Sequence, residues 1–108
     1  MPEWCETQMW CPVTVTSELL NRKWHPVIVH RLLHKPMGFH ELQREVHHIS
    51  DKVLSDSLKD FCEKGIVQKE VVDEKPKEVE YSLTKAGESL DKVIEPMFDW
   101  GREYASRL

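Results

Sequence analysis

Two short amphipathic segments joined by a tight turn, within residues 39–64, constrain the fold of this chain more than any other feature. The second segment carries its own start and stop signals. Ser50 can cap the first free backbone N–H groups, and Gly65 can adopt the left-handed conformation that ends a helix. Ile49 precedes the cap and is spaced to contact Leu54 as a hydrophobic staple. The sequence therefore predicts a helix whose two ends are both fixed locally.

This second segment divides its residues between an apolar and a polar face. Helical spacing places four apolar side chains on one side, namely Leu54, Leu58, Phe61 and Cys62. The other side carries Lys52, Ser55, Asp56, Lys59 and Glu63. Phe39, Leu42 and Val46 have the same helical spacing and predict a preceding helix, with residues 47–49 as the turn. Two helices joined in this way are typical of proteins that insert the second helix into a DNA groove.

Apolar spacing and proline positions predict three further helices. Residues 13–21 form the first, with Pro12 in its opening turn. Residues 24–34 form the second, which is apolar nearly all round and is therefore expected at the centre of the core. The third is a long helix that runs from a Thr84 cap to the end of the chain and that Pro96 can kink.

Alternating apolar and polar residues predict two strands over residues 66–72 and 78–83, joined by a polar loop. A two-stranded hairpin is marginal by itself, so it should lie against the helices. Helix, turn, helix and hairpin is the order of a winged helix-turn-helix. We therefore expect one mainly α domain with a small β-hairpin over residues 1–108, a size typical of one domain.

Composition excludes several classes of protein. No apolar segment approaches the roughly 20 residues that span a bilayer, so we expect no membrane role. The first ten residues include Glu3 and Glu6 and lack the order of a secretory signal, which favours the cytoplasm and three reduced thiols. There is no glycine-rich phosphate loop or nucleophile elbow, so we expect neither an enzyme nor a cofactor.

The predicted terminal helices carry more apolar surface than a small core can bury. The C-terminal helix alone has seven large apolar residues on one broad side: Leu90, Val93, Ile94, Met97, Phe98, Trp100 and Tyr104. The helix over residues 13–21 is also rich in apolar side chains. A single copy would expose a large hydrophobic patch, and self-association as a homodimer would cover it.

Several motifs in order resemble those of the HxlR-type winged helix-turn-helix transcriptional regulators. They are Cys11-Pro12-Val13, Leu19-Leu20, Lys23-Trp24, Phe39 to Leu42, Ile49 to Ser55, Gly65-Ile66-Val67, Val79 to Gly87 and Trp100-Gly101. The resemblance implies a homodimer built by helices at residues 13–21 and 85–106. It also implies a helix-turn-helix at 39–64 that binds double-stranded DNA and a wing at 66–83.

The same resemblance implies which residues contact DNA. The recognition helix contributes Ser50, Lys52, Ser55 and Lys59, the wing contributes Lys75 and Lys77, and Arg44 is placed to clamp the backbone. Where such regulators usually carry Gln-Arg, this chain has Asp56-Ser57, and Glu78 stands where the wing usually has arginine. Asp56 can accept a hydrogen bond from a cytosine amino group, but its charge repels phosphate.

Charge leaves a second interpretation open. The whole chain has a formal net charge of −4, and residues 50–64 have a net charge of −1, from Lys52, Lys59 and Lys64 against Asp51, Asp56, Asp60 and Glu63. DNA affinity comes largely from clustered lysine and arginine. The alternative is therefore a winged-helix module that binds protein and has weak or no affinity for DNA.

Cys11 is a candidate redox thiol. It stands just before the helix at 13–21, where the helix dipole favours a thiolate, and some HxlR-type regulators sense oxidants through a cysteine at this position. The alternative is a small buried hydrophobic residue. The implied signal is an oxidant or a small molecule, and a dimer can enclose an aromatic effector between Trp10, Trp24 and Trp100. Of the six histidines, His30 and His34 have ligand spacing, but no further ligands complete a site, so we predict solvated histidines and no metal.

Overall fold

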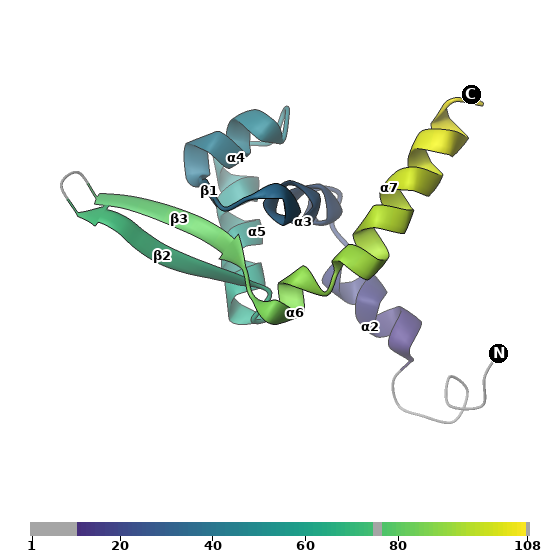
Figure 1. The fold of residues 1–108 in the computed structure, drawn as a ribbon, viewed down its shortest axis with the longest axis horizontal. Coiled ribbons are helices and arrows are strands. Elements are labelled where there is room, and N and C mark those ends of the chain that lie inside the picture. Colours follow the sequence, from purple (N-terminus) through teal and green to yellow (C-terminus); the bar gives the residue numbers. More distant parts are fainter. Residues whose placement is uncertain (1–10, 75–76, 108) are drawn as a thin grey trace.

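A computed structural model describes residues 11–74 and 77–107 (Figure 1). In chain order they form α2 (Pro12–Leu19), α3 (His25–His34), β1 (Met37–Gly38), α4 (Phe39–Glu45), α5 (Asp51–Glu63), β2 (Val67–Glu74), β3 (Lys77–Leu83), α6 (Lys85–Glu88) and α7 (Asp91–Ala105). This order confirms the predicted fold class, a mainly helical winged helix-turn-helix with a small antiparallel sheet.

Helix α3 lies at the centre of the molecule, as its apolar composition predicted. Ile28 and Val29 are fully buried, and the helix contacts α4, α7 and β3. Figure 1 shows the hairpin extending to one side of this helical body and α7 extending to the other. The core consists of Ile28, Val29, Leu32, Met37, Leu42, Val46, Ile49, Leu54, Leu58, Phe61, Ile66, Val67, Leu83, Leu90 and Ile94.

The sheet contains a strand that the sequence did not predict. Its order is β1-β3-β2, and every pair is antiparallel. Strand β1 is only two residues long, with Met37 opposite Tyr81 and Gly38 opposite Glu80. Two residues are too few for an alternating pattern, which is why sequence reasoning assigned them to a turn. β1 joins the base of the hairpin to the start of α4 and so fixes the wing against the helix-turn-helix.

The predicted long C-terminal helix is wrong in one respect, because it is divided into α6 and α7. Thr84 caps α6 as expected, and its hydroxyl accepts a hydrogen bond from the Gly87 N–H at 3.2 Å. Gly87 is buried so closely that an added Cβ would lie 2.2 Å from the Ile66 carbonyl oxygen. This contact holds α6 on the hairpin base, and a tight turn at Ser89 and Leu90 then starts α7 in a new direction.

Helix α7 is joined to α3 through a small group of rings. The His30 ring stacks on Phe98, with centroids 4.8 Å apart and planes 11° from parallel. The Arg31 guanidinium lies 2.6 Å from Nδ1 of His30. Burial, together with the Arg31 charge, lowers the pKa of His30, and a neutral ring can accept a hydrogen bond from that guanidinium. In the part of the chain that the structure describes, no helix is long and apolar enough to cross a membrane.

Candidate nucleic-acid interface

The helix-turn-helix is formed by α4, the turn after it, and α5. Leu42 and Val46 on one side of the turn, and Leu54 and Leu58 on the other, are all buried in the core. His48, in the turn, has a φ of 69°, a left-handed conformation that non-glycine residues adopt uncommonly. The turn is therefore defined by burial on both sides, which sets the direction in which α5 leaves it.

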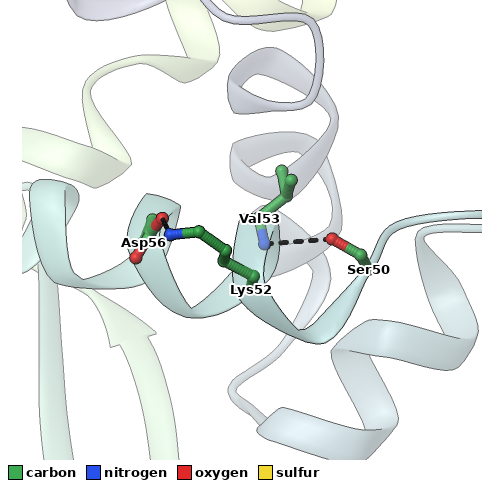
Figure 2. Close-up of polar contacts among 4 residues, drawn as sticks. All are labelled: Ser50, Lys52, Val53 and Asp56. Atoms are coloured by element: carbon green, nitrogen blue, oxygen red, sulfur yellow. Dashed lines mark hydrogen bonds and ion pairs between the residues drawn. The ribbon is translucent and has the colours of Figure 1, made fainter.

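Both ends of α5 agree with the prediction. The Ser50 hydroxyl accepts a hydrogen bond from the Val53 N–H at 3.1 Å, which is the expected N-cap (Figure 2). Beyond the last turn Gly65 has a φ of 74°, the left-handed conformation expected of a residue that ends a helix. The Gln43 amide of α4 also donates a hydrogen bond to the Asp51 carboxylate in the first turn of α5.

The two faces of α5 also match the prediction. Leu54, Leu58 and Phe61 are buried, and the structure buries Ser57 with them, which the apolar pattern did not indicate. Cys62 is partly buried against the core and is a free thiol. Burial raises the pKa of the Cys62 thiol, which disfavours the reactive thiolate. The residues expected on the polar side are all exposed: Lys52, Ser55, Asp56, Lys59 and Glu63.

Two ion pairs lie along the exposed side of α5. The Lys52 ammonium is 3.0 Å from a carboxylate oxygen of Asp56, one helical turn away (Figure 2). The side chains of Lys52 and Asp56 are 84% and 59% exposed, so the pair is worth at most about 1 kcal/mol and can open. Lys64 pairs with Asp60 in the same way. Within the described residues Lys59 makes no ion pair, so its charge is the most available to a phosphate on this helix.

The remaining DNA-contact candidates are distributed around the wing. Arg44 is exposed on α4 and lines a cleft of about 560 Å³ between α4 and the hairpin. Glu78 and Glu80 line the same cleft, so Arg44 faces an acidic wing. Lys77 lies in β3 opposite Glu74, and Lys75 lies outside the described residues. The structure thus brings Arg44 beside the hairpin but does not gather the wing lysines with it.

His25 is the residue near this interface that sequence reasoning missed. It was expected to be a solvated helix histidine, and this is wrong, because only 1% of its surface is exposed. Its ring packs on Phe61 of α5 at 4.5 Å between centroids. The missed signal was its spacing, since His25 lies three, four and seven residues before the buried Ile28, Val29 and Leu32.

Cys11 is the N-cap residue of α2 and is disulfide-bonded in the structure. The expectation that it would be a thiol is therefore wrong for this state of the protein. Its partner lies outside the described residues. A cytoplasmic assignment does not exclude such a bond, because redox-sensing disulfides form transiently in reducing compartments.

The structure does not gather a metal site or the proposed aromatic enclosure from the residues it describes. Over residues 11–74 and 77–107, no group of three or more His, Cys, Asp or Glu residues is arranged to hold a metal ion. Trp24 packs against the core, Trp100 is exposed on α7, and Trp10 lies outside the described residues.

Comparison with known proteins gives consistent matches over most of the chain. A profile of the HxlR-like helix-turn-helix family matches residues 19–108. The HTH-type transcriptional regulator YdeP of Bacillus subtilis is 33% identical over 98 residues, which cover 91% of this chain and 77% of YdeP.

Two relatives are known as redox-related structures. The reduced form of the transcriptional regulator YodB from B. subtilis superposes with a TM-score of 0.74 at 33% identity, covering 89% of this chain and 95% of YodB. YodB has also been solved after diamide treatment and with quinone bound. The redox regulator HypR in its reduced form superposes with a TM-score of 0.81 at 30% identity, covering 86% of this chain and 92% of HypR.

Proposed function

We infer the function from the family to which the chain belongs, the HxlR-like helix-turn-helix family: it is a transcriptional regulator that binds DNA. The finer steps proposed here concern which surface binds DNA, how two copies associate and what signal acts on them. As such a regulator it acts where DNA is, in the cytoplasm, and it is not an enzyme.

The recognition helix in this proposal is α5, and the observation that carries it is the division of its two faces. Its apolar face is buried, which fixes the helix in the fold, while Lys52, Ser55 and Lys59 are exposed on the other side. Ser50 at the N-cap is exposed as well and can meet a phosphate at the start of the helix. In this proposal Lys75 and Lys77 of the wing and Arg44 of α4 contact the DNA backbone.

A DNA-binding titration tests this assignment. Genomic fragments that the protein retains are labelled, and their binding is followed by fluorescence anisotropy at several salt concentrations. We expect salt-steep binding that Lys52→Ala and Lys59→Ala weaken, because each substitution removes a phosphate contact. Lys85→Ala, an exposed lysine on α6, is the matched control and should bind as the wild type does. Absence of binding to any fragment at low salt would instead favour a protein-binding winged helix.

Two copies of the chain associate through α2 and α7 in this proposal. Helix α2 has no buried residue, and Val13 and Val15 are 67% and 53% exposed. On α7 the exposed apolar residues are Met97, Phe98, Trp100 and Tyr104, with the rings of Trp100 and Tyr104 stacked at 4.9 Å. Burying such a surface against a second copy removes it from water. Sedimentation equilibrium should therefore give twice the chain mass of 12.8 kDa.

The signal in this proposal is an oxidant that acts on Cys11. Two thiols lose two protons and two electrons to a quinone or a peroxide and form a disulfide. Cys11 precedes α2, so this bond changes the covalent surroundings of a helix assigned to the dimer contact. The disulfide at Cys11 in the structure and the reduced and oxidised forms of HypR support a thiol-responsive regulator.

A further inference from the structure

A polar cavity of about 340 Å³ lies beside the recognition helix and has no role in the function proposed above. It is bounded by the connection between α2 and α3 on one side and by α5 on the other. Three carboxylates of α5 line it, those of Asp56, Asp60 and Glu63, and Arg22 and Lys59 also line it. The buried His25 completes the lining used here.

His25 presents an unused hydrogen-bond acceptor to this cavity. Its Nδ1 lies 3.2 Å from the Leu19 carbonyl oxygen. Because a carbonyl can only accept, Nδ1 carries the hydrogen, and Nε2 of the neutral ring is then an acceptor. Nε2 is buried and has no hydrogen-bond partner among the residues that the structure describes. Buried polar atoms are rarely left in this state, so each exception calls for an explanation.

The carboxylates around the cavity are held only weakly by their own helix. Asp56 and Asp60 pair with Lys52 and Lys64, and both pairs lie on the exposed surface. In the described part of the chain, Glu63 makes no ion pair, and neither Arg22 nor Lys59 pairs with any of the three carboxylates. The cavity thus combines negative charge with a buried acceptor, which is complementary to a positively charged ligand that donates hydrogen bonds.

We propose that this cavity binds a small organic cation with N–H donors, of the ammonium or amidinium class, and that its binding raises the affinity of α5 for DNA. One N–H group of the ligand donates to Nε2 of His25, and the others donate to the carboxylates of Asp60 and Glu63. A bare metal ion is a poorer fit, because no three ligating side chains of the described residues converge there.

The link to DNA follows from the position of the cavity. Asp56 and Lys59 line the cavity and also belong to the exposed face of the recognition helix. Residues 50–64 have a net charge of −1, so a bound monovalent or divalent cation brings this segment to neutral or positive. A helix beside phosphates then meets less repulsion. This second part of the proposal rests on the proposed DNA-binding function, whereas binding of the cation does not.

Calorimetric titration with 1,4-diaminobutane tests the binding site on the whole chain without DNA. 1,4-Butanediol is the uncharged control ligand, and magnesium chloride at equal ionic strength tests for simple attraction of cations. We expect saturable binding of one diamine per chain and no binding of the diol or of magnesium. We also expect the ¹⁵N resonance of Nε2 in His25 to shift during the titration, because that atom gains a hydrogen bond.

Variants separate this cavity from other acidic surfaces. Asp60→Asn and Glu63→Gln should each weaken diamine binding about tenfold, the usual effect of losing one charge-assisted hydrogen bond. Glu88→Gln removes an exposed carboxylate on α6, outside the cavity lining, and should bind like the wild type. Circular dichroism confirms that each variant is folded. Unchanged binding in both carboxylate variants, or equal binding of the diol, overturns the proposed site.

A DNA titration at constant ionic strength tests the coupling. The diamine should lower the dissociation constant of the wild type for DNA and should have less effect on Asp60→Asn. DNA binding that the diamine leaves unchanged overturns the coupling while the DNA-binding function stands. Diamine binding by a protein that retains no DNA fragment has the opposite meaning, because it supports the cavity and contradicts the proposed function.

Discussion

Replacing Asp56 with asparagine should strengthen DNA binding by this protein. The carboxylate of Asp56 lies 3.0 Å from the Lys52 ammonium, and both side chains are mostly exposed. The substitution releases Lys52 and removes a negative charge from the surface assigned to DNA. The net charge of residues 50–64 then rises from −1 to zero. The fold should not change, because position 56 lies opposite the buried face of α5.

The size of the effect follows from two small contributions. An exposed ion pair one helical turn apart is worth about 0.5 kcal/mol, and Lys52 no longer has to break it to reach a phosphate. Removing the repulsion between a carboxylate and a phosphate about 8 Å away in water is worth another ~0.5 kcal/mol. In a dimer both subunits gain, giving about 2 kcal/mol in total, which corresponds to about 30-fold tighter binding.

Fluorescence anisotropy with a retained genomic fragment measures this gain. Because the contributions are electrostatic and exposed, the ratio of mutant to wild-type affinity should shrink as salt rises. Asp91→Asn is the matched control, since it makes the same change in total charge at an exposed position on α7. An equal gain in Asp91→Asn would mean that only total charge matters. Weaker binding by Asp56→Asn would refute the reasoning and indicate that Asp56 itself accepts a hydrogen bond from a base.

Three further substitutions test separate parts of the structure. Ser50→Ala should lower the free energy of unfolding by about 1 kcal/mol in urea, because it removes the N-cap of α5, whereas Ser50→Asp should keep most of it. Gly87→Ala should lower the melting temperature sharply, since its Cβ would lie 2.2 Å from a backbone oxygen, while Gly101→Ala, with nothing within 4 Å, should be tolerated. Cys11→Ser should leave DNA affinity unchanged in reductant and abolish its response to quinone, and equal oxidant sensitivity in the wild type would contradict the assigned role of this thiol.

The parts of the fold that sequence could predict are those determined by neighbouring residues. The cap at Ser50, the left-handed Gly65 and the buried face of α5 all depend on side chains within a few positions of one another. The two-residue strand β1 has no such local pattern and exists because Met37 and Gly38 pair with β3. The break after α6 depends likewise on a contact between Gly87 and the distant Ile66 carbonyl.

The candidate site divides along the same line. The ion pair between Lys52 and Asp56 was available from sequence, because residues four apart on a helix face each other. The cavity beside His25 was not, since it forms only where the chain between α2 and α3 meets α5. The disulfide of Cys11 was not predictable either, because cysteine count and compartment favoured free thiols.

The acidic character of α5 is best understood from how its position is fixed. Its buried face and Ser50 cap position the helix, and neither involves a charge on the exposed side. Charges on that side can therefore change DNA affinity with little effect on folding. This separation makes a firm demand on Asp56→Asn: the urea midpoint should stay within about 0.5 kcal/mol of the wild type, as for most surface substitutions, while DNA affinity rises. Affinity and stability that changed together would mean that the exposed charges also position the helix.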